Sequence, residues 1–212
     1  AQGGFGVVYE GEWQHTKVAI KELLAKGLPE KLQQAFEKET NLMLGFRHPN
    51  IVLLYGITIN PNGMVMEYLE GGSLFDRLRS DKPMSDSLKL SIALDMSKGL
   101  SYLHSKQILH KDIKSLNVLL DEHHKAKLTD FGLSEIKTHT SSTSKQDQSG
   151  TARWGAPELA KGEVKTFSQA CDVYSLAMTF VELVTSAVPH ADLERDFQIV
   201  GRFYSNTYPI LP

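Results

Sequence analysis

The sequence predicts an α+β fold in which a strand-rich first part with one helix precedes a mainly helical second part. Four short runs have the composition of strands, namely Val7–Gly11, Lys17–Lys21, Ile51–Ile59 and Met64–Tyr68. In the second part, apolar residues recur mainly at helical spacing. Two glycines within Glu70–Ser73 separate the two parts. We therefore expect a small lobe over residues 1–69 and a large lobe over residues 70–212.

The composition is that of a folded domain without unusual charge. Of its 212 residues, 41% are hydrophobic and 23% charged, and the formal net charge is −2. This content supports a hydrophobic core, and the lack of positive charge argues against a nucleic-acid partner. The single cysteine, Cys171, excludes an internal disulfide and fits a reducing compartment. No window approaches the roughly 18 apolar residues of a spanning helix. We expect no membrane segment in this chain, and a cytoplasmic protein or the cytoplasmic part of a larger one.

Helical patterns occur in both parts. Residues 29–46 predict a helix whose apolar face carries Leu32, Phe36 and Met43, and Glu39 falls on the same face. In the second part, Ser85 is a suitable N-cap for a helix. The apolar stripe of that helix consists of Leu88, Ile92, Met96, Gly99 and Leu103. Residues 168–184 are apolar nearly all round and predict a central buried helix. Between these helices we expect two small strands, residues 118–120 and 125–129.

A glycine-rich stretch, GGFGVVY, opens the chain from Gly3 to Tyr9. Glycines lack Cβ atoms, so their backbone N–H groups can approach phosphate oxygens closely. Taken alone, the stretch is explained better by a plain hairpin turn.

Lys21 and Glu39 are charges within apolar patterns. Lys21 ends the apolar run VAIK, and Glu39 lies on the apolar face of the predicted helix. Either each side chain reaches outward to water, or the two form a Lys–Glu pair that directs an ammonium at a phosphate. The two residues alone support both alternatives equally.

The stretch HKDIKSLN places an acid, an ammonium and an amide within six residues, at Asp112, Lys114 and Asn117. These groups suit phosphoryl transfer, in which a carboxylate orients a hydroxyl, an ammonium neutralises phosphate charge and an amide oxygen binds a metal. Asp130, in DFG, offers a second oxygen ligand suited to Mg²⁺. We expect an apolar strand on either side of the loop to hold the three groups in place.

In order, the chain carries GGFGVV, VAIK, Glu39 before HPN, EYLEGGSL, HKDIKSLN, TDFG, APE and CDVYSL. This order and spacing resembles the eukaryotic protein kinase catalytic domain over essentially the whole chain. RHPNIV, GTARWGAPE and the DVYS helix look most like the tyrosine-kinase-like group of serine/threonine kinases. The resemblance implies a bilobal protein-kinase-like fold, with a small antiparallel β lobe and a mainly helical large lobe whose C-terminal helices are missing.

The resemblance also implies roles for individual residues. The ATP phosphates would be covered by Gly3, Gly4, Phe5 and Gly6. The adenine site would comprise Val8, Ala19, Met66, Glu67, Leu69 and Leu119, with the backbone of Glu67 and Leu69 bonding the base. Lys21, held by Glu39, would contact the α- and β-phosphates. Asp112 would be the catalytic base, Lys114 would neutralise γ-phosphate charge, and Asn117 and Asp130 would bind Mg²⁺. Asp172 would brace the backbone of the catalytic loop.

The implied activity is transfer of the ATP γ-phosphate to Ser or Thr hydroxyls of protein substrates. Lys114 and Thr151 resemble the serine/threonine pattern of the family. The polar loop of residues 138–149 predicts a phosphosite for an upstream activating kinase. Two alternatives are a pseudokinase, meaning a nucleotide-binding or interaction module without transfer, and a weaker one, a small-molecule kinase. The presence of Lys21, Asp112 and Asp130 favours the active kinase. Truncation of the large lobe is expected to weaken the stability and activity of this piece.

Overall fold

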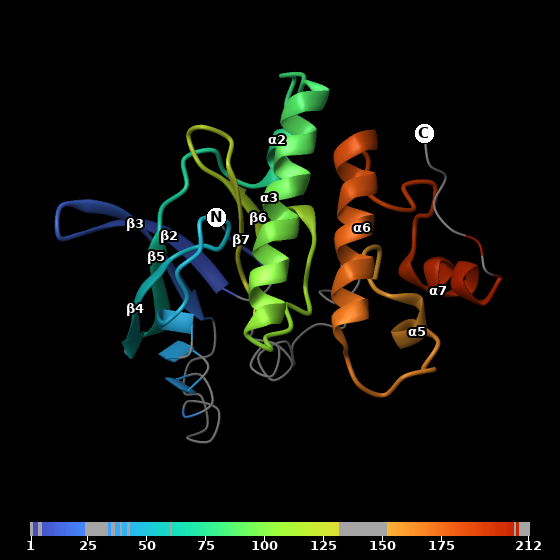
Figure 1. Cartoon of the computed structure of the whole chain (residues 1–212), viewed down its shortest axis with the longest axis horizontal. Coiled ribbons are helices and arrows are strands. Elements are labelled where there is room, and N and C mark those ends of the chain that lie inside the picture. Colours follow the sequence, from blue (N-terminus) through green and yellow to red (C-terminus); the bar gives the residue numbers. More distant parts are fainter. Residues whose placement is uncertain are drawn as a thin grey trace.

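We analysed a computed structural model of the chain. It describes residues 2–3, 6–23, 34, 37–38, 40–41, 43–59, 61–131, 152–205 and 207. Figure 1 shows the strands gathered on one side of the molecule and the helices α3, α6 and α7 following one another on the other side. The predicted α+β class, with a strand-rich small lobe and a helical large lobe, is confirmed.

The small lobe is built on a five-stranded antiparallel sheet with the order β1-β2-β3-β5-β4. The strands are β1 (Gln2–Gly3), β2 (Gly6–Trp13), β3 (Thr16–Leu23), β4 (Leu54–Ile59) and β5 (Asn62–Glu67). Residues 34, 37–38, 40–41 and 43–44 are helical, which agrees with the helix predicted for residues 29–46 wherever that segment is described.

The predicted bounds of β4 and β5 need correction. Residues 51–53 lie outside β4, because the N–H of Val52 donates to Leu128 O (2.9 Å) in the large lobe instead of to a neighbouring strand of the sheet. Between the two strands, Asn62 pairs with Ile59, so β5 begins at Asn62 and not at the predicted Met64.

The large lobe contains helices α2 (Leu74–Leu78), α3 (Asp86–Ser105), α5 (Pro157–Ala160), α6 (Gln169–Thr185) and α7 (Asp196–Tyr204). It also contains the 3₁₀ turn η1 (Ser115–Asn117) and a two-stranded sheet of β6 (Val118–Leu120) and β7 (Ala126–Leu128). The Ser85 cap is confirmed, because its side chain accepts a bond from Leu88 N (3.3 Å). Ile92, Met96, Gly99 and Leu103 of the predicted stripe are buried.

Helix α6 is only partly the buried helix that the sequence predicted. Cys171, Leu176 and Leu183 are buried, whereas Val173 and Val184 are each 54% exposed. The apolar composition all round the helix therefore does not translate into burial all round. The helix packs against α3 and η1, and the two valines remain half exposed.

One hydrophobic core extends through both lobes and borders the space between them. It includes Met64 and Met66 from β5, Ile92 and Met96 from α3, and Leu128 from β7.

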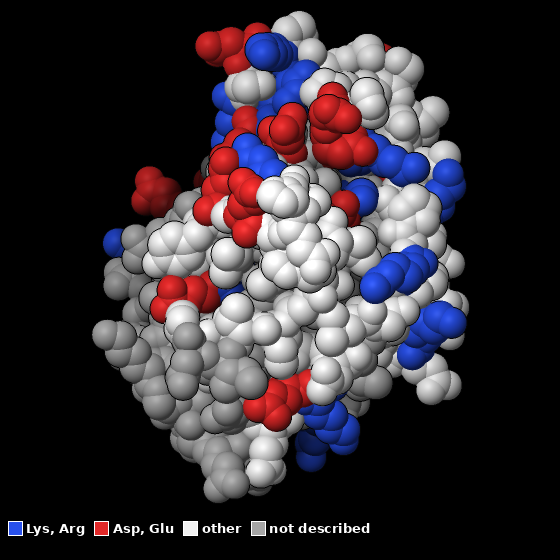
Figure 2. Space-filling view, turned by 90° about the vertical axis from the view of Figure 1, so that its left-hand side faces the viewer, with Lys and Arg blue, Asp and Glu red and all other residues white. Residues whose placement is uncertain are grey.

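On the face in Figure 2, acidic and basic side chains lie next to one another in the upper half and an uncharged area occupies the middle. Within the described residues, no helix combines the length and apolar character needed to cross a bilayer.

Candidate active site

A cleft of about 550 Å³ collects the predicted site residues. Its lining includes every predicted catalytic, nucleotide-binding or metal-binding residue that the structure describes, except the glycines Gly3 and Gly6: Val8, Ala19, Lys21, Met66, Glu67, Leu69, Asp112, Lys114, Asn117, Leu119 and Asp130. These residues come from positions more than 100 apart in the sequence, so the fold brings together what the sequence keeps separate. The volume suits a ligand of nucleotide size.

The described part of the glycine-rich stretch lies in two paired strands. Gly3 of β1 stands opposite Gly6 of β2 in the antiparallel register, and Gln2 stands opposite Val7. β2 continues into Val8, which lines the cleft. Gly4 and Phe5, predicted to cover phosphates, lie outside the described residues.

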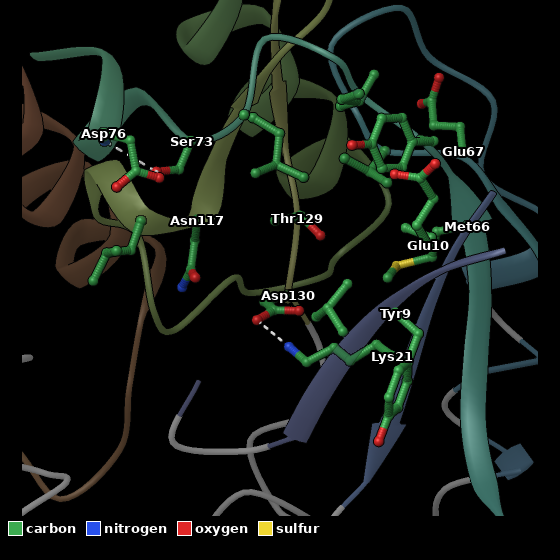
Figure 3. Close-up of a pocket in the computed structure, with 18 of the residues that line it drawn as sticks. Tyr9, Glu10, Lys21, Met66, Glu67, Ser73, Asp76, Asn117, Thr129 and Asp130 are labelled. Carbon is green, nitrogen blue, oxygen red and sulfur yellow. Dashed lines mark hydrogen bonds and ion pairs between the residues drawn. The ribbon is translucent and has the colours of Figure 1, made fainter. Parts of the chain in front are cut away.

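Lys21, in β3, does not extend to solvent. It is 7% exposed, and its ammonium pairs with Asp130 Oδ2 across the cleft, as Figure 3 shows. Burial of an ammonium requires such a partner, because an isolated buried charge is expensive. The outward-reaching alternative is therefore wrong for Lys21. The predicted partner Glu39 lies outside the described residues, so the Lys21–Glu39 pair stays a prediction.

The acid, ammonium and amide of HKDIKSLN contact one another directly. Lys114 Nζ lies 2.9 Å from Asp112 Oδ1. The Asn117 side-chain N–H₂ donates to the backbone carbonyl of Asp112 (2.6 Å) and to its Oδ2 (2.9 Å). Because the side-chain nitrogen of Asn117 makes these bonds, its side-chain oxygen Oδ1 is the atom that a metal would bind.

The loop is fixed differently from the prediction of a strand on either side. β6 follows it, but residues 106–114 are not in a strand. Instead, the fully buried carboxylate of Asp172 on α6 accepts bonds from His110 N and Lys111 N, both at 2.8 Å. His104 Nε2 lies 2.9 Å from the same carboxylate. The predicted contact of Asp172 with this backbone is present, and it takes the place of the missing strand.

Asp130 lies two residues after the end of β7. The N–H of Thr129 donates to Asn117 O (3.0 Å), which ties the strand to the loop that carries Asn117. Asp130 has φ 63, a left-handed conformation that Asp tolerates better than most residues. The next residue, Phe131, is 2% exposed, and its ring packs against His110 with centroids 6.1 Å apart.

The donor set of the cleft fits a nucleotide carrying Mg²⁺. Asp130 and Asn117 supply the hard oxygens that Mg²⁺ prefers, and Lys21 and Lys114 supply positive charge for phosphates. Across the described part of the chain, no three His, Cys, Asp or Glu side chains gather into a metal site. Mg²⁺ is usually held by one or two protein ligands together with substrate phosphates.

Several lining residues were not predicted from the sequence. Ser73 Oγ lies 2.6 Å from Asp76 Oδ2 at one end of the cleft, as Figure 3 shows, and Thr129 lines its interior. Ser73 follows the two glycines of EGGS and Thr129 precedes DFG, so both could have been found as neighbours of recognised motifs. Asp76 carries no such signal.

A buried carboxylate behind the catalytic loop was also missed. Glu182 is fully buried on α6 and accepts bonds from Trp154 Nε1 (3.1 Å) and from both terminal nitrogens of Arg79 (3.2 Å each). Burial raises the pKa of the Glu182 carboxyl, and bonds from Ser115, Arg79 and Trp154 partly offset this. Arg79 precedes Glu182 by 103 residues, so no local pattern could have revealed the contact.

Comparison with known proteins places the chain in a family. Residues 1–208 match the family model described as "Protein tyrosine and serine/threonine kinase". The chain is 39% identical, over 91% of its length, to a probable serine/threonine-protein kinase of Dictyostelium discoideum. It is also 39% identical, over 94% of its length, to the probable serine/threonine-protein kinase SIS8 of Arabidopsis thaliana. The matched regions cover 21% and 19% of these relatives, so the chain spans about a fifth of their length. By the extent of the family match and by these relatives, the chain belongs to the protein tyrosine and serine/threonine kinase family.

Proposed function

We propose that this chain is a catalytically active protein serine/threonine kinase domain, which transfers the γ-phosphate of ATP to Ser or Thr hydroxyls of proteins. The observation that carries the proposal is the single cleft lined by Lys21, Asp112, Asn117 and Asp130. Protein kinases as a family use ATP and Mg²⁺, and the donors in this cleft fit both. The curated relatives named above are serine/threonine kinases, which favours Ser and Thr over Tyr as acceptors.

Each residue has one task in this proposal. Mg²⁺, when bound, would neutralise the negative charge of the phosphates. Asn117 and Asp130 would hold the metal, and Lys21 would hold the phosphates nearest β3. Asp112 would accept the proton of the substrate hydroxyl and orient its oxygen, and Lys114, 2.9 Å from Asp112, would stabilise charge on the transferred group.

The adenine would lie between Val8 and Ala19 on the small-lobe side and Leu119 on the large-lobe side, with Met66 behind it. The N–H of Glu67 already donates to Leu53 O (3.0 Å), so the carbonyl of Glu67 is its group for the base. Gly3, Gly4, Phe5 and Gly6 would cover the phosphates, and Glu39 would hold Lys21.

Regulation and location complete the proposal. An upstream kinase would phosphorylate the hydroxyl-rich loop of residues 138–149, which lies outside the described residues. The protein, or the part of it that carries this chain, would work in the cytoplasm.

The direct test is transfer of labelled γ-phosphate from Mg-ATP to a generic protein, with Asp112→Asn as the variant. Because general base catalysis contributes about 10²- to 10⁴-fold, we expect the variant to lose activity on that scale while still binding Mg-ATP. Phosphoamino acid analysis should find phosphoserine or phosphothreonine. Equal transfer by both proteins would refute the role of Asp112. A wild-type chain that binds Mg-ATP without transferring phosphate would instead identify a pseudokinase.

A further inference from the structure

An ion pair joins the two sheets beside the cleft. Lys127 Nζ lies 2.8 and 2.6 Å from the two carboxylate oxygens of Glu67. The side chains are 17% and 16% exposed, so the pair is largely withdrawn from water. Glu67 ends β5 of the five-stranded sheet, whereas Lys127 lies in β7 of the two-stranded sheet. The pair is therefore one of the contacts that tie the small lobe to the large lobe, together with the backbone bonds of Asn50 and Val52 to Leu128.

Hydrogen bonds from neighbouring backbone N–H groups hold the Glu67 carboxylate and the strand β7 in place. Glu67 Oε1 also accepts a bond from Leu53 N (2.7 Å), so its carboxylate is held from two sides. The preceding residue, Val52, donates its N–H to Leu128 O (2.9 Å), next to Lys127. A carboxylate with this many donors keeps one orientation, and the backbone at residue 67 is fixed with it.

The pair also has a particular place relative to the nucleotide. Glu67 lies at the proposed adenine end of the cleft, and Lys127 in β7 precedes the proposed metal ligand Asp130, which follows the end of that strand, by three residues. β7 is anchored to the catalytic loop by the bond from Thr129 N to Asn117 O. A shift of β7 relative to β5 would thus change the distance between the two ends of the cleft.

We propose that the Lys127–Glu67 pair fixes the spacing between the adenine end and the metal end of the cleft, which makes Lys127 a positioning residue for ATP. The inference rests on the function proposed above. A ligand that reaches both ends depends on their spacing, whereas one that occupies only the adenine end does not. Mg-ATP belongs to the first kind and adenosine to the second.

An ion pair that contributed only to folding stability would give a different result. A partly exposed ion pair typically contributes up to about 1 kcal/mol to stability. If Lys127 did only this, its loss would lower the unfolding midpoint, and the dissociation constants for Mg-ATP and adenosine would keep their ratio.

The experiment measures dissociation constants of Mg-ATP and adenosine, by calorimetric titration, for the wild-type chain and the variant Lys127→Met. Methionine keeps most of the aliphatic stem and removes the ammonium. We expect the Kd for Mg-ATP to rise about tenfold, equivalent to about 1.4 kcal/mol, and the Kd for adenosine to stay within about twofold. Lys127→Arg should restore Mg-ATP binding, because a guanidinium can contact both carboxylate oxygens.

Two further variants sharpen the test. Lys127→Gln also removes the ammonium and leaves a neutral side chain of similar length, so it should act like Lys127→Met. Lys125→Met, which changes an exposed lysine two residues before Lys127, is the matched control and should bind both ligands like wild type. If Lys127→Met does not fold, Lys127→Gln carries the test.

Wild-type affinity for Mg-ATP in Lys127→Met, or an equal loss for Mg-ATP and adenosine, would overturn the spacing role. If the wild-type chain binds Mg-ATP but transfers no phosphate, the proposed kinase activity fails and the dissociation constants still decide this inference. If it binds no Mg-ATP, both are overturned.

Discussion

At the scale of single residues, Asp172 shows how one buried carboxylate can replace a secondary-structure element. It accepts bonds from two consecutive backbone N–H groups just before Asp112. One of them belongs to Lys111, which has φ 66, a conformation that is unfavourable for a lysine. The bonds to Asp172 offset this cost and keep the catalytic loop in one conformation.

Asp172→Asn should therefore weaken both stability and activity. An amide has one acceptor oxygen, so a buried donor loses its partner and an N–H₂ group faces another donor. We expect the free energy of unfolding to fall by about 1–3 kcal/mol, measured by urea denaturation, and kcat to fall while the Kd for Mg-ATP changes little. Unchanged stability and kcat would show that the loop is held by other contacts. Asp86→Asn, on an exposed residue of α3, is the control.

A second residue gives the protein a pH response outside the site. His190 is 2% exposed, and burial lowers its pKa below the ordinary value of 6.5. The nearby Arg202 and Arg153 lower the pKa further, and Asp192 raises it. The folded state thus favours the neutral imidazole. As the pH falls below about 6.5, the unfolded chain takes up a proton that the folded chain resists, so stability decreases.

His190→Asn should flatten this dependence. Asparagine does not titrate and tolerates the left-handed backbone at this position, where φ is 55. Thermal unfolding midpoints between about pH 5 and pH 8 should fall less steeply in the variant than in wild type. Burial also lowers the pKa of His48, so the variant should retain some slope. Identical slopes for the two proteins would contradict the account.

At the scale of elements, local patterns predicted those structures whose contacts are local or repeat regularly. The stripe of α3 and its Ser85 cap were predictable because 3.6-residue spacing and cap chemistry belong to the helix itself. Residues 51–53 were assigned to a strand because their apolar composition does not reveal that they bond to β7. The short amphipathic helix α7 was not predicted, although Ile199 and Phe203 form its buried face.

Gly99 tests the packing of α3 against Asn50 and Leu128. A Cβ at this position would lie 2.6 Å from Asn50 O and 3.2 Å from Leu128 Cδ1. Alanine raises intrinsic helix propensity by about 1 kcal/mol relative to glycine, yet we expect Gly99→Ala to destabilise the protein by about 1–3 kcal/mol through overpacking. Ser101→Ala, on an exposed position of the same helix, should be neutral or slightly stabilising. A gain in the urea midpoint for Gly99→Ala would show that α3 can move away from Asn50.

At the scale of the whole molecule, the cleft depends on contacts that join distant parts of the chain. The residue types at Lys21, Asp112, Asn117 and Asp130 were identifiable from their motifs, and their convergence was expected from the resemblance to protein kinases. The supporting contacts were not identifiable: Lys127 with Glu67 and Arg79 with Glu182 are separated by 60 and 103 residues. Lysine, arginine and glutamate are also common on protein surfaces, so the sequence does not distinguish these paired residues from exposed ones. Only the folded structure shows the pairs.

The central claim is that these four side chains surround a metal-bound triphosphate, and the Mg²⁺ dependence of ATP binding tests it most directly. The measurement is the Kd for ATP with and without Mg²⁺, for wild type and for Asp130→Asn. Mg²⁺ should tighten ATP binding by wild type, and most of this gain should disappear in the variant, because a neutral amide replaces the carboxylate that we propose as a metal ligand and that pairs with Lys21. An equal gain from Mg²⁺ in both proteins would contradict the account.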